Sequence, residues 1–184
     1  MPRKHRDEIR QGFRTAGNIL FGFITLVLIM IGRHIVGVIA DTHGLLRPEA
    51  LEVLKGVRLI IHAGDIGGPE VLEGLRLLAP VVAVRGNNDR GQWARQLPDV
   101  QLVRVANTSI HVLHDLKEIR MKPSAKEFEV VVSGHSHRPS VYRRDGVLFV
   151  NPGSAGPRRF KLPVSVARLT IEASDVKPEL VELL

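Results

Sequence analysis

HIVGVIADTHG, residues 34–44, is the stretch that decides the fold of this 184-residue chain. Residues 34–40 are mostly β-branched or apolar, which predicts a buried strand. The strand then ends in four polar or glycine residues, Asp41 to Gly44. The same plan recurs in RLIIHAGD, residues 58–65, and in the run that ends in GNND, residues 86–89. Because the carboxyl ends of parallel strands meet at one edge of a sheet, we expect these polar residues to form one site.

Helical patterns separate these strands. Pro48–Lys55 and Pro69–Leu78 each begin with proline, which is favoured in the first turn of a helix. Within the second segment, apolar residues recur at helical spacing. The two segments alternate with the strand at residues 58–62 and another expected at residues 80–84. This alternation predicts a parallel sheet with right-handed crossovers.

The second half of the chain is richer in strands. Asn107-Thr108 and Arg144-Asp145-Gly146 have the composition of hairpin turns. The last two strands are expected to form an antiparallel pair. Together the two halves predict an α/β (α+β) sandwich, in which two β-sheets pack together with helices outside. The strands of the second half are expected at residues 101–106, 109–114, 128–133, 140–143, 147–150, 164–171 and 177–183.

Polar side chains at the strand ends form the most informative chemical pattern of the chain. Oxygen and imidazole ligands suit Mn²⁺, Fe²⁺, Ni²⁺, Co²⁺ or Zn²⁺ better than Ca²⁺ or Mg²⁺. The chain has no cysteine, which excludes thiolate metal sites and disulfides. Seven ligands are too many for one tetrahedral ion, but they suffice for two ions if one carboxylate bridges them. The seven candidates are Asp41, His43, Asp65, Asn87, His114, His135 and His137.

In order along the chain, the series D-x-H, G-D, G-N-x-D, H and G-H-x-H resembles that of the calcineurin-like metallophosphoesterases. The small size is similar to the compact bacterial and archaeal branch of that superfamily, which shares its fold with the vacuolar-sorting retromer subunit. The resemblance covers residues 34–184 and includes Asn151-Pro152-Gly153-Ser154. It implies a four-layer αββα fold, with two mixed sheets flanked by helices.

The same resemblance implies a role for each ligand candidate. Two divalent cations would be bridged by Asp65, and a water held between them would attack phosphorus while they neutralise phosphoryl charge. Mn²⁺ is the first expectation, with Ni²⁺, Fe²⁺, Co²⁺ or Zn²⁺ as alternatives. Asp41, His43 and His137 would bind the first cation, and Asn87, His114 and His135 the second.

Other positions qualify this resemblance. Asn88 stands where many of these phosphatases have a histidine that protonates the leaving group, and an amide supplies no proton at neutral pH. Asp89 either supports a neighbouring ligand or caps the following turn. Asp115 follows a predicted histidine ligand where the family usually has glycine. Arg158, beside Arg159, either reaches a substrate phosphate or belongs to a solvated basic pair. We take Asn88 and Asp89 as catalytic candidates, and Arg158 as a substrate-binding candidate.

A metal-dependent phosphoesterase, and within that class a phosphodiesterase acting on a small phosphate ester, is the function that these residues favour. The alternative from another class is a non-catalytic metal-binding scaffold, as in the retromer subunit, although a scaffold needs no complete ligand set. A nuclease is a third hypothesis. The net charge is +7, but residues 1–33 contribute +4, and only one Trp and one Tyr are present. Both facts weigh against a nucleic-acid partner.

Residues 1–33 form a basic and apolar extension before the expected domain at residues 34–184. Basic residues precede an almost entirely apolar run at residues 19–31, an order similar to a signal anchor. The run is shorter than the roughly 20 residues that a spanning helix needs. One interpretation is a membrane anchor. The other, which we favour, is an extension upstream of a start at Met30, and it predicts a cytoplasmic protein.

Overall fold

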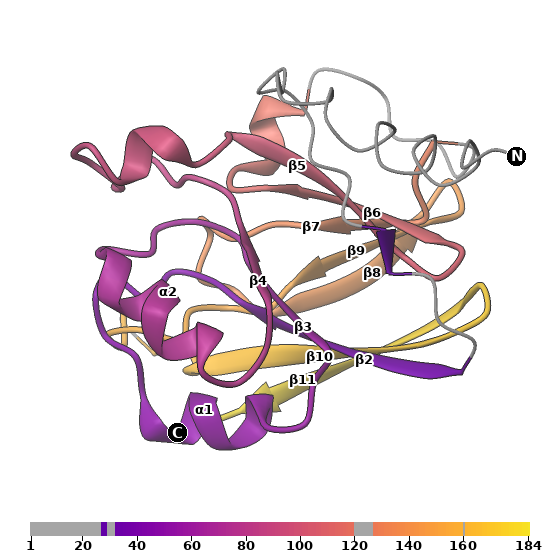
Figure 1. The fold of residues 1–184 in the computed structure, drawn as a ribbon, viewed down its shortest axis with the longest axis horizontal. Helices are drawn as coiled ribbons and strands as arrows, with labels where there is room; N and C mark the ends of the chain where they lie inside the picture. Colours follow the sequence, from indigo (N-terminus) through magenta and orange to yellow (C-terminus); the bar gives the residue numbers. More distant parts are fainter. Residues whose placement is uncertain (1–26, 29–31, 120–126, 160) are drawn as a thin grey trace, which may run out of the picture.

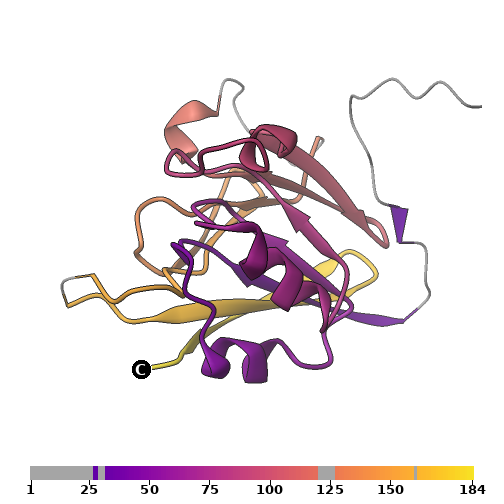
Figure 2. The same ribbon diagram turned by 60° about the vertical axis from the view of Figure 1, so that its left-hand side comes forward.

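Two mixed β-sheets packed face to face form the framework of the chain (Figure 1, Figure 2). The structure is a computed structural model and describes residues 27–28, 32–119, 127–159 and 161–184. One sheet has five strands in the order β11-β10-β2-β3-β4, and the other has six in the order β1-β5-β6-β7-β9-β8. The predicted sandwich of two mixed sheets is therefore confirmed.

Parallel pairing is the feature of the five-stranded sheet that positions the site. Val38 pairs with Ile61 of the next strand, and Ile61 pairs with Val82, so three strands end at the same edge. The predicted antiparallel pair at the end of the chain completes this sheet. The strands are β2 (Arg33–Ile39), β3 (Leu59–His62), β4 (Val81–Ala83), β10 (Ser165–Glu172) and β11 (Asp175–Glu182).

The six-stranded sheet combines two hairpins with parallel pairing of β6, β7 and β9. The first hairpin turn is Ala106-Asn107 and not the predicted Asn107-Thr108, because Thr108 pairs with Val105 and belongs to the strand. Ala106 takes a positive φ of 50° to make this tight turn. The strands are β1 (Val27–Leu28), β5 (Val100–Val105), β6 (Thr108–Leu113), β7 (Val130–Val132), β8 (Ser140–Arg144) and β9 (Val147–Asn151).

Helices α1 (Pro48–Leu54) and α2 (Pro69–Arg76) lie on the outer face of the five-stranded sheet (Figure 2). Both begin at the predicted prolines. Gly37, in the middle of β2, lets α1 approach closely, because a Cβ at this position would collide with Leu54. Single 3₁₀ turns at Ala94–Gln96 (η1) and Leu116–Glu118 (η2) complete the helical elements of the described residues.

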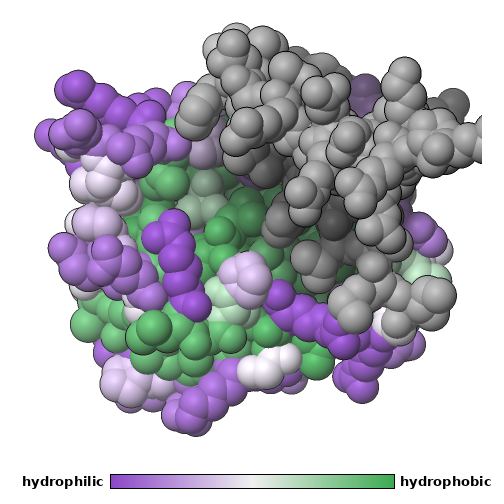
Figure 3. Space-filling view, in the orientation of Figure 1, coloured by the Kyte–Doolittle hydropathy of each residue, from purple (hydrophilic) through white to green (hydrophobic). Residues whose placement is uncertain are grey.

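The main core lies between the two sheets. Valine, isoleucine and leucine side chains from the inner faces of both sheets form it, as alternation along each strand predicts. A second cluster joins α1 and α2 to the five-stranded sheet, and a third, around Phe128 and Phe149, covers the outer face of the six-stranded sheet. On the face shown in Figure 3, apolar residues remain visible between polar ones. At the edge of the five-stranded sheet, β4 leaves Val81 and Val82 only half-buried.

Most of the N-terminal extension lies outside the described residues, and with it most of the apolar run at residues 19–31. Its described part, Val27–Leu28, forms the short strand β1, which pairs with β5. Across the described residues, no helix combines the length and apolar character needed to cross a membrane.

Candidate metal centre

The loops after β2, β3, β4, β6 and β7 meet at one edge of the sandwich, as the sequence predicts. The backbone N–H of Asp41 donates to the carbonyl of Gly64, at 3.0 Å, and thereby joins the first two loops. The N–H of Gly134 donates to the carbonyl of His114, also at 3.0 Å, and joins two loops of the other sheet. Contacts between side chains then join the loops of the two sheets, such as His43 with His137 and Asn87 with His114. The seven predicted ligands thus lie close together.

Five of these seven residues have positive φ angles, which side-chain-bearing residues rarely adopt. The angles are 53° at Asp41, 48° at His43, 54° at Asp65, 66° at His135 and 57° at His137. Each such angle costs on the order of 1 kcal/mol or more, and residues of this kind concentrate at functional sites. These backbone conformations destabilise the folded chain, but they direct the five side chains into the site.

Asp41, His43 and His137 form the first group of candidate ligands. The Nε2 atom of His137 lies 3.3 Å from Oδ1 of Asp41 and 3.4 Å from Nε2 of His43. The Asp41 side chain is fully buried, and neither of its oxygens has a hydrogen bond of standard geometry to a described residue. Burial raises the pKa of Asp41 to about 7. Burial, followed by the Arg159 charge, lowers the pKa of His137 to about 4.

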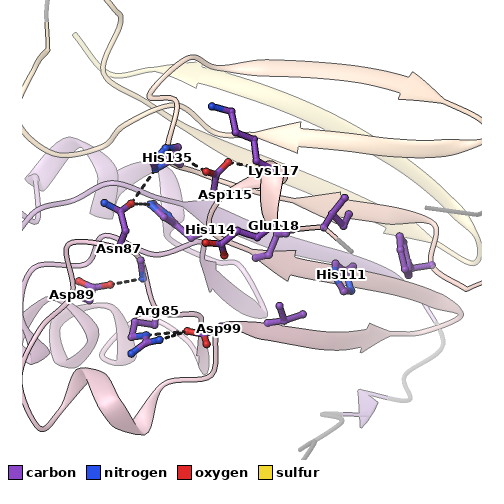
Figure 4. A pocket seen from close by; sticks show the side chains of 15 residues that line it. Arg85, Asn87, Asp89, Asp99, His111, His114, Asp115, Lys117, Glu118 and His135 are labelled. Carbon is purple, nitrogen blue, oxygen red and sulfur yellow. Dashed lines mark hydrogen bonds and ion pairs between the residues drawn. The ribbon is translucent and has the colours of Figure 1, made fainter. Parts of the chain in front are cut away.

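Asp65, Asn87, His114 and His135 form the second group, and the last three are labelled in Figure 4. The Oδ1 atom of Asn87 lies 3.0 Å from both Nε2 of His114 and Nδ1 of His135. The Oδ2 atom of Asp65 is 3.4 Å from Nε2 of His114. The same Oδ2 is 3.9 Å from Nε2 of His43, so Asp65 lies between the two groups.

Both ring nitrogens of His114 face oxygen atoms in the second group. The carbonyl of Ala63 can only accept, so Nδ1 of His114 must donate to it, at 2.7 Å. Burial alone would lower the pKa of His114, but Asp65 and the Ala63 carbonyl together raise it above its ordinary value. Hydrogen bonds from His114 and from Asn88 outweigh the burial of Asp65 and hold its pKa below the ordinary range. A cation at Nε2 of His114 would compete with any proton on that nitrogen.

The two catalytic candidates after Asn87 have different surroundings. Asn88 points into the site: its Nδ2 donates to Oδ2 of Asp65 at 2.6 Å, and its backbone N–H donates to Oδ1 at 2.8 Å. Asp89 instead accepts from the backbone N–H groups of Gly67, at 2.9 Å, and Gly86, at 2.8 Å. Asp89 thus links the loop after β3 to the loop after β4 through hydrogen bonds.

Further polar residues hold the ligand loops from behind. The buried ring of His62 lies with Nε2 2.9 Å from Oγ1 of Thr42, and Thr42 donates to the Ile66 carbonyl at 2.9 Å. His62 must therefore donate to Thr42, which fixes its tautomer. The contact makes His62 a hydrogen-bonded histidine of the core. The sequence did not predict that its partner would be Thr42, which lies between the candidate ligands Asp41 and His43.

The Asn151-Pro152-Gly153-Ser154 loop supports two ligand loops at once. Asn151 donates to the carbonyl of Gly134, at 2.7 Å, and to Oγ of Ser136, at 3.1 Å. Ser154 donates to the carbonyl of Asp41 at 2.9 Å. The motif therefore carries a structural task that the sequence pattern alone did not reveal.

Asp115, the departure from the expected glycine, faces a candidate ligand. Its Oδ2 lies 3.5 Å from Nε2 of His135, and its Oδ1 accepts from the backbone N–H of Lys117. A carboxylate next to the outer nitrogen of a histidine leaves the inner nitrogen free for a metal. In this position Asp115 contacts His135, while His114 keeps its contacts with Ala63 and Asn87.

The two neighbouring arginines differ in direction. Arg158 donates from Nε to the Leu162 carbonyl at 3.3 Å. Arg159 instead places Nη2 3.3 Å from Nε2 of His43. The structure therefore brings Arg159 to the site, and not Arg158, the substrate-binding candidate chosen from the sequence.

The donor set fits divalent cations. Each of two groups, Asp41 with His43 and His137, and Asp41 with Asp65 and His114, offers ligand atoms that all lie within 4.8 Å of one another. Three oxygen-bearing side chains and four imidazoles match the preference of intermediate divalent ions. A cation would also neutralise the buried Asp41 carboxylate, whose oxygens have no hydrogen bond of standard geometry to a described residue.

A cavity of about 1050 Å³ opens beside Asn87, His114 and His135 (Figure 4). Apolar side chains such as Leu113 and Phe128 line it, together with charged ones such as Asp115 and Lys117. A smaller cavity of about 460 Å³ shares His135 and Asp115 with the first and extends over β8 and β9. The larger one has ample room for an organic group attached to phosphate.

Comparison with known proteins places these features in a family. The calcineurin-like phosphoesterase superfamily domain matches residues 35–174. A probable metallophosphoesterase of Methanothermobacter thermautotrophicus is 32% identical over 80% of this chain and 91% of its own length. A probable metallophosphoesterase of Methanocaldococcus jannaschii is 34% identical, over 80% of this chain and 81% of its own. A phosphodiesterase of the same archaeon is 29% identical, over 64% of this chain and 82% of its own.

Solved structures show the same fold. Wild-type Vps29 of Entamoeba histolytica complexed with Zn²⁺ has a TM-score of 0.62 and 25% identity, over 82% of this chain and 99% of that one. An archaeal phosphodiesterase has a TM-score of 0.65 and 24% identity, over 80% of this chain and 99% of that one.

Proposed function

This chain belongs to the calcineurin-like phosphoesterase superfamily, and from that premise we propose that it is a phosphodiesterase that works with two divalent cations. The observation that carries the proposal is the convergence of seven nitrogen and oxygen ligands from five strand ends, among them a buried Asp41 carboxylate without a described hydrogen-bond partner. A scaffold would gain no stability from such an arrangement, because burial of a carboxylate destabilises the fold.

The proposed ligand sets follow the two groups. We assign Asp65 as the bridge, since its Oδ2 faces one histidine of each group, His43 and His114. Asp41 also belongs to both groups of closely spaced ligand atoms, but its Oδ1 faces only the first group, at His137. The first cation would be held by Asp41, His43 and His137, and the second by Asn87, His114 and His135. Mn²⁺ is the proposed metal, and the Zn²⁺ complex of Vps29 supports Zn²⁺ as an alternative.

When bound, such cations lower the pKa of a water and stabilise charge on phosphoryl oxygens. The chain's own residues prepare the site for this chemistry. Asn88 orients the Asp65 carboxylate through two hydrogen bonds. Asp89 holds the loops of Asp65 and Asn87 together through Gly67 and Gly86. The large cavity next to His114 would receive an organic group of the ester.

The structure of the site favours diesters over alkyl monoesters. Asn88 occupies the position of the expected general acid and cannot donate a proton at neutral pH. An alkoxide leaving group needs such a proton, whereas a stabilised leaving group does not. The similarity to a phosphodiesterase of Methanocaldococcus jannaschii supports the same substrate class.

Turnover of a chromogenic phosphodiester with added Mn²⁺ tests this proposal. Asp65→Ala should lower kcat/KM by about a hundredfold or more and reduce the bound metal below two ions per chain. Asp175→Ala serves as the matched control, because this carboxylate is exposed in β11 and pairs only with Lys177 among the described ion pairs. Near-normal turnover by Asp65→Ala with its metals bound would exclude the bridge. A wild-type protein that binds metal but cleaves no ester would favour the scaffold.

A further inference from the structure

We propose that Arg159 binds the phosphate of the substrate, and that in the metal-free protein its guanidinium is held on the ligand nitrogen of His43. This inference rests on the proposed function, because it requires a cation at His43. Arg159 follows the 151–154 loop and is exposed, with Nη2 3.3 Å from Nε2 of His43.

The contact determines which nitrogen of His43 carries the lone pair. A guanidinium has only donors, so Nε2 of His43 must accept and its proton must sit on Nδ1. Nε2 is also the atom that faces Nε2 of His137, at 3.4 Å, and Oδ2 of Asp65, at 3.9 Å. Arg159 therefore occupies the lone pair that a cation in the first ligand group would use.

A guanidinium and a divalent cation cannot share this lone pair. Both are positive, and repulsion at such short distances is strong in a partly buried site. Binding of the cation would thus release the guanidinium from His43 while leaving it at the mouth of the site.

The released group has the chemistry of a phosphate ligand. Its planar fork of N–H donors matches two phosphoryl oxygens, and it keeps its charge at every physiological pH. It stands on the exposed side of the first ligand group, where a phosphate held by the cations would still present free oxygens. Arg158 cannot be used in the same way from its present position, because it is directed to the Leu162 carbonyl.

Arg159→Ala and Arg158→Ala form a matched pair of variants for the test. Calorimetry on the whole chain would measure the Kd for Mn²⁺, and then the Kd of inorganic phosphate for the Mn²⁺-loaded protein. For Arg159→Ala we expect phosphate binding to weaken about tenfold or more, as for loss of a charge-assisted hydrogen bond. We expect Mn²⁺ to bind as tightly as in the wild type or up to about tenfold more tightly, because a competing positive charge is gone. Arg158→Ala should change both constants by less than about twofold.

Two results would overturn the inference. Equal weakening of phosphate binding in both variants would mean a diffuse effect of positive charge. Weaker Mn²⁺ binding in Arg159→Ala would mean that the guanidinium supports His43 and does not compete with the metal. Arg159→Lys, which keeps the charge without the fork, should recover only part of the phosphate affinity. Both readouts are binding constants, so a wild type that binds metal and phosphate without turnover would refute the proposed function and leave the result for Arg159 standing.

Discussion

Asn88 is the residue at which this site departs most from the chemistry of an efficient monoesterase. Its side-chain amide donates to the Asp65 carboxylate at 2.6 Å, so it lies within the site and yet supplies no acid. General acid catalysis is typically worth about 10²–10⁴-fold for a poor leaving group. The reaction is therefore expected to depend on how stable the leaving group already is.

Asn88→His should raise kcat/KM for alkyl esters by about tenfold or more, and for nitrophenyl esters much less. Nitrophenolate is stable as an anion and gains little from a proton donor, whereas an alkoxide gains much. The measurement is kcat/KM on both ester types, in both proteins, at equal metal occupancy. Equal gains on the two substrates would point to altered metal geometry. A wild type that already prefers alkyl monoesters would indicate another acid in the cavity.

The buried carboxylate of Asp41, a proposed metal ligand, is expected to destabilise the metal-free protein. Burial raises its pKa to about 7 from the ordinary 3.8. The folded chain then holds this proton more tightly than the unfolded chain does. The contribution of Asp41 to the free energy of unfolding of the metal-free protein therefore falls as pH rises from about 4 to about 7, and above that the whole penalty is present.

Asp41→Asn removes that penalty, because asparagine is neutral at every pH. In the presence of a chelator at pH 8, we expect its free energy of unfolding to exceed that of the wild type by about 1 kcal/mol or more. Urea denaturation would measure this difference. With Mn²⁺ added, the order should reverse, because only the wild type gains binding energy at the first ligand group. A variant less stable than the wild type in chelator would contradict the assignment.

Among the elements, the loops after the parallel strands depend on close backbone approach. Gly67, with φ of +89°, donates its N–H to Asp89, and a Cβ at this position would collide with the backbone of His43 and Gly44. Gly56, in the loop between α1 and β3, has φ of +74° and open space around it. The two glycines therefore share the conformational demand but differ in their neighbours.

Gly67→Ala should displace the His43 loop and lower both metal affinity and kcat/KM by about a hundredfold or more, since small shifts of a ligand have large effects. Gly56→Ala should cost about 1 kcal/mol of stability, from its positive φ alone, and leave kcat/KM unchanged. Denaturation, metal titration and kinetics on both variants would separate the two effects. If both variants kept full activity, steric pressure on the His43 loop would be excluded.

At the scale of the whole molecule, the site depends on the contact between the two sheets. Asp41, His43, Asp65 and Asn87 come from loops of the five-stranded sheet, and the remaining ligand candidates come from the six-stranded sheet. The valine-rich core between the sheets therefore sets the distance between the two halves of each ligand group. All of these residues lie after residue 33.

A chain that starts at Met30 should consequently fold, stay in solution and keep its kcat/KM within about twofold, because it retains every ligand and the whole central core. It loses the two-residue strand β1, whose only strand partner among the described residues is β5. Denaturation and kinetics in detergent-free buffer, next to the full chain, provide the measurement. Aggregation of the shorter chain, with the full chain stable only in detergent, would favour the membrane anchor.

The sequence by itself was enough to predict the parallel strands and the meeting of their polar ends at one edge. Apolar runs such as residues 34–40 and the polar residues directly after them are local signals, and parallel strands bring such ends together whatever surrounds them. The ordered D-x-H, G-D, G-N-x-D and G-H-x-H pattern also indicated the family that the comparisons then showed.

Only the tertiary structure decided which side chains meet. Arg159 and His43 are 116 residues apart, and Ser154 and Asp41 are 113 apart. Asp115 faces His135, not its neighbour in the chain, and Thr108 joins its strand because of its pairing with Val105. Such contacts depend on how two sheets pack and on which rotamer each side chain then adopts. No local pattern of residues encodes them, because packing is a property of surfaces assembled from distant parts of the chain.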